Sequence, residues 1–318
     1  MMSTTSPAPL PRSGEEQPRR TVLRWGDRFL GPAFWAAAAL ALRAVLFCQG
    51  GKRISALLRV RDEEQFLYAA AKSIIAYVDE MVLVDNLSSD RSPQIMRQLS
   101  EEHADKVRCL HYDYALARRG REHWELASNP ATRSSPHLSS NYNNWCLRQC
   151  RERFILRWDA DMIPTAAFSQ ALQSWRSSGA AVLSLLGANV HPDRRHLVAG
   201  KVSDAGRLAE GLTVPVVPRW LTTMSYTSFE ERLFPRFGAR HTNAVWWTFT
   251  FASPFTHPRL RKRFVQQPAE PAYLHLRFCK HNPLVGYSQD FAQAVSSNLG
   301  LGPELRPEWQ ELIQRWNV

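Results

Sequence analysis

The sequence predicts an α/β protein with a mostly parallel sheet flanked by helices. Apolar runs of strand length alternate with segments of helical periodicity four or five times between residues 54 and 186. Acidic residues follow three of these runs, at the strand ends where open sheets of this class bind ligands. The chain has 318 residues, 44% of them hydrophobic and 22% charged, which suits a large buried core. This composition excludes disorder, a collagen-like repeat and a polytopic membrane protein for the bulk of the chain.

The first part of the chain gives the clearest elements, because its short apolar runs are separated by polar turns. The expected strands cover residues 54–61, 81–84, 107–112, 154–158 and 181–186. The expected helices cover residues 66–78, 95–99 and 137–151. A further helix is expected to start at Pro164, since a proline at the first helical position loses no hydrogen bond.

The alternation is lost after Asn189, where Pro, Arg and aromatic residues become dense. Short strands are expected there over residues 214–217, 232–234, 245–251 and 273–278. Two closing helices are expected over residues 284–299 and 303–316. The aromatic residues suit either an ordinary core or a site that stacks sugar rings.

Basic residues are concentrated near the start of the chain. Eight Arg or Lys residues stand against Asp27 alone between residues 20 and 61, in a chain of net charge +11. The Ala-rich segment 29–47 within this stretch is interrupted by Arg43, and a spanning helix needs about 20 mostly apolar residues. We expect a basic amphipathic helix over residues 21–50, resting on an anionic membrane surface or packed on the protein body. Residues 1–20, rich in Ser, Thr and Pro, are expected to be a disordered leader.

The five cysteines are scattered, which argues against a disulfide scaffold and favours a reducing compartment. We therefore expect a cytoplasmic protein, with peripheral contact at the inner face of the plasma membrane left open. The basic charge indicates an anionic partner, but no helix-turn-helix, zinc-finger or RNA-binding strand motif is present in the sequence. Nucleic acid is therefore not the expected partner.

Two aspartates, Asp159 and Asp161, follow the fourth expected strand with one small residue between them. Adjacent carboxylates repel each other unless a cation neutralises them, and a hard divalent cation accepts oxygen ligands while leaving positions for phosphate oxygens. The pair therefore predicts a Mn²⁺ or Mg²⁺ site that holds a diphosphate. The alternative is a solvated turn whose aspartates cap the helix near Pro164.

Taken together, four segments resemble glycosyltransferase family 2, whose members have the GT-A fold, a Rossmann-like sheet with an elaborated C-terminal acceptor half. These segments occur in the family's order between residues 54 and 164: Arg59-Val60-Arg61-Asp62-Glu63-Glu64, Leu83-Val84-Asp85-Asn86, Asn144-Trp145 with Leu147, and Trp158-Asp159-Ala160-Asp161-Met162. Asn86 stands where many members carry a second aspartate. The resemblance implies transfer of a sugar from a UDP- or GDP-sugar to a glycan or glycolipid of the cell envelope, with inversion. Residues 51–190 would then be the nucleotide-sugar-binding half and residues 191–318 the acceptor-binding half with the C-terminal helices.

The resemblance also implies roles for individual residues. The donor nucleotide would be bound by Val60, Arg61, Asp62, Glu63, Asp85, Asn86 and Asp159. His275 resembles a late histidine of the family that completes the metal site with Asp159 and Asp161, and a half-buried structural histidine is the alternative. Arg232 and Arg277 are candidate phosphate ligands, because guanidinium binds phosphate through two hydrogen bonds. Glu230 and Glu231 are the candidates for the catalytic base, with Glu230 preferred, and the alternative is that both are surface charges paired with Arg232 and Arg236.

Three other classes compete with this interpretation. A sugar-nucleotide pyrophosphorylase would need a Gly-rich phosphate loop after the first strand, where Asp62-Glu63-Glu64 stand instead. A catalytically inactive GT-A-like scaffold or binding protein is disfavoured by the intact Asp-Ala-Asp motif. A basic nucleic-acid-binding protein lacks its motifs.

Overall fold

The computed structural model describes residues 51–117, 126, 129–132, 134–180, 182–199, 213–218, 265–266, 269–280 and 300–317. The expected leader and amphipathic helix, the expected strands at 232–234 and 245–251, and the expected helix at 284–299 lie outside the described residues.

Nine of the described strands form one sheet, in the order β3-β2-β1-β4-β8-β6-β10-β5 with β9 beside β6. Five of the eight pairings are parallel, so the predicted α/β fold with a mostly parallel sheet is confirmed. The strands are β1 (Ile54–Val60), β2 (Glu80–Asp85), β3 (Val107–His111), β4 (Phe154–Asp159), β5 (Met162–Pro164), β6 (Val182–Asn189), β8 (Thr213–Pro218), β9 (Val265–Gln266) and β10 (Tyr273–His275). A separate antiparallel pair joins β7 (His196–Ala199) to β11 (Gly300–Glu304).

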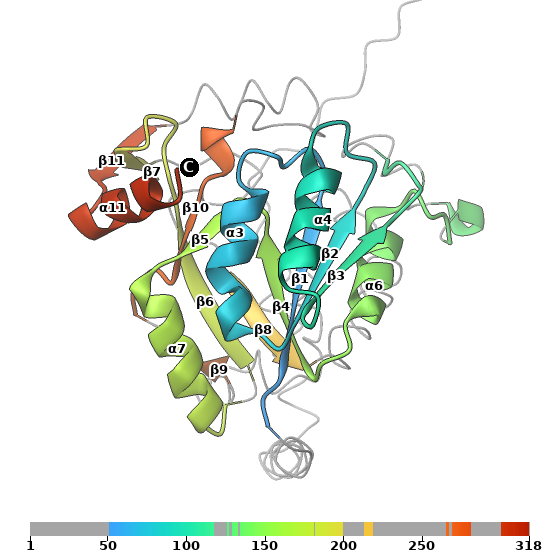
Figure 1. Ribbon diagram of the computed structural model, residues 1–318, viewed down its shortest axis with the longest axis horizontal. Coiled ribbons are helices and arrows are strands. Elements are labelled where there is room, and N and C mark those ends of the chain that lie inside the picture. The colour runs from blue at the N-terminus through green and yellow to red at the C-terminus, as the bar shows by residue number, and fades with distance from the viewer. Residues whose placement is uncertain are drawn as a thin grey trace, which may run out of the picture.

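Helices cover both faces of the sheet (Figure 1). They are α3 (Leu67–Ile74), α4 (Ser92–Glu102), α6 (Ser139–Gln149), α7 (Ala166–Ser177) and α11 (Pro307–Arg315), with short 3₁₀ turns η1 (Ile75–Tyr77), η2 (Pro130–Thr132) and η5 (Arg277–Cys279). Side chains alternate along β1, so Ala56 and Leu58 pack in the cluster that contains α3, α4 and α7, whereas Leu57 packs in the cluster that contains α6. Both faces of the central strands are therefore buried, as a parallel sheet requires.

Three expected elements are wrong in detail. Pro164 ends strand β5 instead of starting a helix, because β5 pairs antiparallel with β10 and places Pro164 opposite Tyr273. The helix after it, α7, begins only at Ala166. The expected strand at 273–278 ends at His275 and continues as the turn η5. The expected last helix also begins late, because residues 300–304 pair with β7 as β11.

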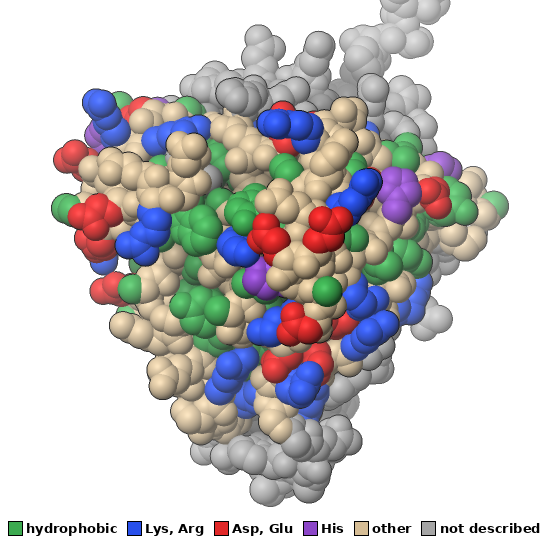
Figure 2. Space-filling model, in the orientation of Figure 1, with side chains coloured by type: hydrophobic (Ala, Val, Ile, Leu, Met, Phe, Trp, Pro, Cys, Tyr) green, Lys and Arg blue, Asp and Glu red, His purple; other side chains and the backbone are tan. Residues whose placement is uncertain are grey.

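Charge on the face seen in Figure 2 is mixed, with acidic and basic side chains interspersed over α3 and α4. Ion pairs account for part of this pattern, for example Lys72 with Glu102 at 2.5 Å and Arg91 with Glu64 at 3.1 Å. In the part of the chain that the structure describes, no helix has the length and apolar character needed to cross a bilayer.

Candidate metal and nucleotide site

The carboxyl ends of β1, β2 and β4 meet at one edge of the sheet. In the parallel pairings, Arg59 of β1 lies beside Asp159 of β4, and Val60 of β1 lies beside Asp85 of β2. Asp85 and Asp159 are therefore separated by only one strand at the same edge. The sequence-based expectation that the acids after these strands share an edge is confirmed.

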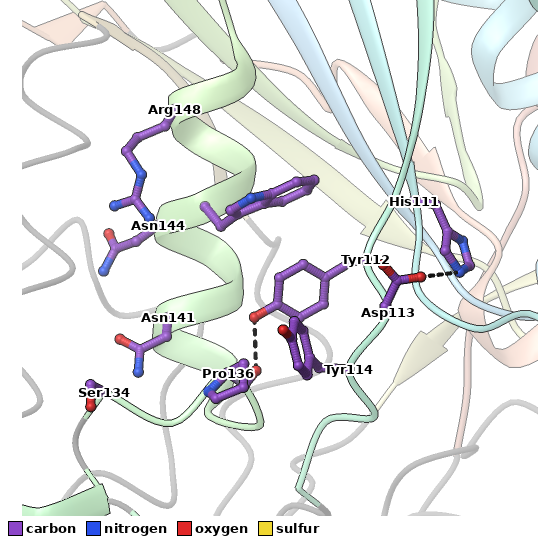
Figure 3. A pocket seen from close by; sticks show the side chains of 10 residues that line it. His111, Tyr112, Asp113, Tyr114, Ser134, Pro136, Asn141, Asn144 and Arg148 are labelled. Atoms are coloured by element: carbon purple, nitrogen blue, oxygen red, sulfur yellow. Dashed lines mark hydrogen bonds and ion pairs between the residues drawn. The ribbon is translucent and has the colours of Figure 1, made fainter.

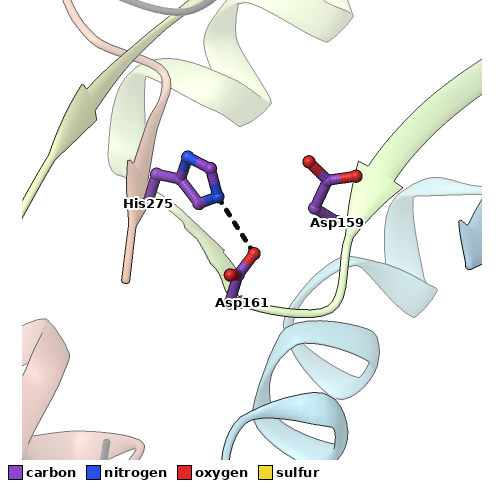
Figure 4. A group of neighbouring side chains, drawn as sticks. All are labelled: Asp159, Asp161 and His275. Carbon is purple, nitrogen blue, oxygen red and sulfur yellow. Dashed lines mark hydrogen bonds and ion pairs between the residues drawn. The ribbon is translucent and has the colours of Figure 1, made fainter. Parts of the chain in front are cut away.

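Asp159, Asp161 and His275 come together at this edge (Figure 4). Each offers one ligand atom, and the three atoms all lie within 4.8 Å of one another. Asp161 and His275 are buried, and His275 Nε2 lies 3.0 Å from Asp161 Oδ1. The Asp159 side chain is 42% exposed and lies 3.6 Å from Arg59 Nη2. The cluster is thus accessible to solvent at Asp159 and buried at Asp161.

Local hydrogen bonds fix the turn that carries both aspartates. The Leu276 N–H donates to the carbonyl of Asp161 at 2.8 Å, which ties the turn to the end of β10. The indole N–H of Trp158 donates to the carbonyl of Met162 at 3.1 Å, on the other side of the turn. Because β10 also pairs with β5, His275 stands opposite Met162 and next to Asp161. Neighbouring strands therefore hold the side chains in register.

The ligand atoms of these three side chains suit a divalent cation. Two carboxylates favour Mg²⁺ or Mn²⁺, and a neutral imidazole adds a nitrogen ligand that Mn²⁺ accepts. His275 turns Nε2 toward Asp161 (Figure 4), so Nε2 is the ring nitrogen placed to bind the ion, while Nδ1 is buried without a hydrogen-bond partner among the described residues. Asp159, Asp161 and His275 therefore fit a Mn²⁺ or Mg²⁺ ion.

A lysine that the sequence analysis did not single out completes this cluster. Lys280 Nζ lies 2.5 Å from Asp161 Oδ2 and 2.7 Å from Glu63 Oε1. Burial would raise the pKa of Asp161, but Lys280 and His275 outweigh burial and hold it well below its usual range. Burial would lower the pKa of Lys280, but the Asp161 and Glu63 carboxylates raise it instead. Burial and the charge of Asp161 raise the pKa of Glu63, against the opposing effect of Lys280.

The turn after β1 is hydrogen-bonded to the turn after β2. The backbone N–H groups of Asp62, Glu63 and Glu64 donate to Ser88 Oγ, Ser92 Oγ and Asp90 Oδ2 at 3.0, 2.8 and 2.8 Å. Asp62 has a left-handed φ of 55°, which aspartate tolerates better than most residues. Its Oδ1 accepts hydrogen bonds from the N–H and hydroxyl of Ser89 at 2.7 and 3.0 Å. These contacts occupy the turn's donors, so it does not form a phosphate-binding cradle of free N–H groups.

Asp85 is buried, and both of its carboxylate oxygens are engaged. Oδ1 accepts the N–H of Ser88 at 3.2 Å, and Oδ2 lies 2.8 Å from His111 Nδ1. His111 is half exposed, and its Nε2 lies 3.2 Å from Asp113. The neighbouring Asn86 is buried, and its amide donates to the carbonyls of Tyr112 and Tyr114 at 3.1 and 2.8 Å. Asp85 and Asn86 thus position the segment after β3.

That segment lines a cavity of about 440 Å³ between the end of β3 and helix α6 (Figure 3). The lining combines aromatic rings, amides and one guanidinium, and its residues are His111, Tyr112, Asp113, Tyr114, Ser134, Pro136, Asn141, Asn144, Trp145 and Arg148. Tyr112 stacks at a tilt on Trp145, with ring centroids 5.1 Å apart. Asn144 lines the cavity, and its Oδ1 is buried without a hydrogen-bond partner among the described residues. His111 connects this cavity to Asp85.

The remaining predicted site residues are placed as follows. Val60 is buried, and its carbonyl accepts the N–H of Asn86 at 2.9 Å. Arg61 is exposed. Arg277 lies in η5 with its guanidinium 5.9 Å from the ring centroid of Phe278. Glu230 and Arg232 lie outside the described residues, so their roles stay predictions.

Two residues of the site were missed from the sequence. Lys280 has no local motif, because its partners lie more than 100 positions away along the chain. His111 was taken only as part of a strand. The signal that could have indicated His111 is its position at the carboxyl end of a strand next to that of Asp85.

Comparisons with known proteins give a distant structural likeness. No protein-family model matches the chain, and no curated protein matches it either. Glucosyl-3-phosphoglycerate synthase from Mycobacterium tuberculosis, solved with Mn²⁺, UDP and glucosyl-3-phosphoglycerate, matches at 15% identity and a TM-score of 0.39, over 83% of this chain and 84% of that chain. The same enzyme with Mn²⁺, UDP-glucose and phosphoglyceric acid matches at 14% identity and a TM-score of 0.40, over 88% and 83%. A putative glucose-1-phosphate thymidylyltransferase from Bacillus anthracis matches at 7% identity and a TM-score of 0.41, over 80% and 98%.

Proposed function

We propose that the protein is a divalent-metal-dependent glycosyltransferase of the GT-A type, which moves a sugar from a nucleotide sugar to a glycan or glycolipid acceptor with inversion. The observation that carries this proposal is the Asp159, Asp161 and His275 cluster, whose ligand atoms lie within 4.8 Å of one another. The cluster shares its sheet edge with Asp85 and with the cavity beside β3. A metal site and a ring-sized cavity at one edge suit a ligand that has a diphosphate at one end and a base at the other.

In this mechanism the chain's residues bind and orient the donor. Asp159, Asp161 and His275 would hold Mn²⁺ or Mg²⁺, which when bound would stabilise the negative charge of the departing diphosphate. The nucleoside base would enter the cavity, where His111, oriented by Asp85, and the amide side chain of Asn144 offer polar groups. Tyr112, Tyr114 and Trp145 offer faces on which a base can stack. Glu230 remains the candidate base for the acceptor hydroxyl, and Arg232 and Arg277 remain candidate phosphate ligands.

The turn after β1 favours a transferase over a sugar-nucleotide pyrophosphorylase. A pyrophosphorylase would need free backbone N–H groups at this turn to bind the phosphates. The N–H groups of Asp62, Glu63 and Glu64 already donate to side chains of the turn after β2. A catalytically inactive protein with the same fold remains the second alternative, and it differs from the proposal in its ligand binding and turnover.

Calorimetry with UDP and GDP, each with and without Mn²⁺, tests the proposal. We expect one nucleotide to bind tightly and only when Mn²⁺ is present, and the corresponding sugar nucleotide to be turned over in the presence of an acceptor. Asp159→Asn should remove the Mn²⁺ dependence, whereas Asp105→Asn, at an exposed position in the turn before β3, should behave as the parent. Absence of any nucleotide binding contradicts the proposal and favours a scaffold. Formation of a sugar nucleotide from a nucleoside triphosphate and a sugar 1-phosphate contradicts it in favour of a pyrophosphorylase.

A further inference from the structure

Lys280 holds its ammonium group inside the proposed metal site. Its Nζ contacts Asp161 Oδ2 at 2.5 Å and Glu63 Oε1 at 2.7 Å, and its side chain is only 16% exposed. The contacts join three separate segments: the residue after η5, the turn after β4 and the turn after β1. Such a buried ammonium is stable only because its carboxylate partners are charged.

The two oxygens of Asp161 are consequently both in use. Oδ2 faces Lys280, and Oδ1 faces His275 Nε2 at 3.0 Å. A metal ion that uses Asp161 as a ligand has to displace one of these partners or approach beside them. A divalent ion next to the ammonium is also repelled by it, and this repulsion is strong where water is excluded.

The charges of the cluster favour binding of a metal ion and a diphosphate together over binding of either one alone. Two carboxylates, Asp159 and Asp161, face two cations, Lys280 and Arg59, and the carboxyl group of Glu63 contacts Lys280. A divalent ion alone adds two positive charges beside a lysine, and a diphosphate alone adds negative charge beside the two aspartates. When both arrive, their charges largely cancel, and an ammonium released from Asp161 has an anionic phosphate to contact.

We propose that Lys280 is a resident cation that competes with the divalent metal for Asp161 and transfers its contact to the diphosphate when metal and nucleotide bind together. Lys280 thereby makes the two ligands bind cooperatively. The inference rests on the proposed function, because it assumes that a nucleoside diphosphate is bound at this edge. It assigns Lys280 as a positioning residue and a phosphate contact that neither the sequence motifs nor the resemblance indicated.

The test measures Mn²⁺ binding by calorimetry or electron paramagnetic resonance, with and without saturating UDP or GDP. In the parent protein, the nucleotide should tighten Mn²⁺ binding about tenfold or more, and Mn²⁺ should tighten nucleotide binding by the same factor. In Lys280→Met, Mn²⁺ alone should bind about tenfold more tightly than in the parent, because the competing ammonium is gone. The factor by which the nucleotide tightens Mn²⁺ binding should fall to about threefold or less. Lys72→Met removes a lysine with an equally short ion pair, to Glu102, and should leave both quantities unchanged.

Lys280→Met leaves two buried carboxylates without their cation, so its folding is checked by circular dichroism. The double variant Glu63→Gln/Lys280→Met removes both partners of the Glu63–Lys280 contact and should show the same gain in Mn²⁺ affinity. Lys280→Arg keeps the cation and should retain cooperativity. If Lys280→Met or the folded double variant binds Mn²⁺ no more tightly than the parent and keeps full cooperativity, the inference is wrong while the proposed function stands. If the parent binds neither Mn²⁺ nor a nucleotide, the proposed function itself fails.

Discussion

Tyr273 of β10 packs against Gly187 of β6 so closely that no side chain fits between them. The two residues are direct partners in the parallel pairing of these strands, and a Cβ atom at position 187 would lie 2.1 Å from Cζ of the Tyr273 ring. Tyr273 is fully buried, and its ring meets Trp158 of β4 edge-on at 5.5 Å between centroids. Gly187 therefore determines how β10 lies in the sheet, and β10 carries His275.

Gly187→Ala should lower the free energy of unfolding by about 1–3 kcal/mol, the usual cost of overpacking a core, because the Tyr273 ring has to move. It should also weaken Mn²⁺ binding, since His275 lies two residues after Tyr273. Urea unfolding and Mn²⁺ titration measure the two effects. Gly51→Ala is the matched control, because a Cβ there has no neighbour within 4 Å. A Gly187→Ala protein as stable as the Gly51→Ala protein would contradict this packing.

Asp159 and Asp161 should respond differently to the same substitution. Both Asp159→Asn and Asp161→Asn should weaken Mn²⁺ binding about tenfold or more, since loss of even an outer-shell partner costs that much at many metal sites. Only Asp161→Asn should also destabilise the metal-free protein, by about 3–5 kcal/mol, because it breaks a buried pair with Lys280. The Asp159 contact with Arg59 is 3.6 Å long and partly exposed, so its loss should cost less than about 1 kcal/mol.

Metal titration and thermal unfolding of both variants distinguish these outcomes. Both variants should lose metal affinity, but only Asp161→Asn should also lose stability. Equal melting temperatures for the two variants would show that Asp161 is not the stabilising partner of Lys280. Unchanged metal affinity in both would contradict the metal site.

Glu80, which lies outside the Asp159, Asp161 and His275 cluster, should make the free energy of unfolding depend on pH in the acidic range. Burial would raise its pKa, but hydrogen bonds from Ser55, Arg151 and Arg108 lower the pKa below the ordinary value of 4.5. A carboxyl whose pKa is depressed in the folded state contributes stability that is complete above its unfolded pKa and is lost as the pH falls through its folded pKa. The free energy of unfolding of the parent should therefore fall as the pH drops below about 4.5.

Glu80→Gln should be less stable than the parent by about 1–3 kcal/mol at pH 7, because Arg108 keeps a poorer partner in a buried position. The difference should shrink toward pH 3, which urea unfolding at pH 7, 5, 4 and 3 measures. Glu101→Gln, at an exposed position of α4, is the control. A constant difference at every pH would show that ionisation of Glu80 is not its cause.

Tyr114→Ala tests the cavity beside β3. Tyr114 lines the cavity, is 48% exposed and lies 5.5 Å from Tyr112 between ring centroids. Loss of one stacking face should weaken nucleotide binding by about 1 kcal/mol or more, which is about fivefold, and leave Mn²⁺ binding in the absence of nucleotide unchanged. Calorimetry gives both constants, and Leu301→Ala, which removes an exposed side chain on β11, is the control. Nucleotide affinity equal to that of the control would place the base elsewhere.

The strands that carry the acids were predictable from the sequence, because each is a continuous apolar run buried on both faces. The expected strand at 154–158 became β4, and the acids after it lie at the shared edge. The strand β5 was not predictable, because it is only three residues long and exists through pairing with β10. Pro164 misled the assignment, because its preference for helix starts is a local property and the pairing with Tyr273 is not.

The cluster of Asp159, Asp161 and His275 was predictable from short-range patterns, but its surroundings were not. The Asp-Ala-Asp motif and the alternation around His275 are local signals, and the three side chains do come together. Glu63 was expected to contact the donor, yet it pairs with Lys280, 217 positions away along the chain. The sequence around Lys280 does not indicate that contact, because Glu63 and Lys280 come together only through the topology of the sheet.

The place of β10 between β6 and β5 has a consequence for biosynthesis. Residues 159 and 161 leave the ribosome more than 100 residues before His275 and Lys280, and a chain released only to residue 270 lacks β10, the strand that pairs with β5 in the described part of the sheet. Domains tend to acquire structure from the N-terminus during synthesis, at about 5–20 residues per second. Competence to bind the ion should therefore arise in one late step, several seconds after both aspartates have emerged. A ribosome stalled before residue 270 should carry a nascent protein in which β5 lacks its pairing with β10 and the two aspartates lack His275 beside them.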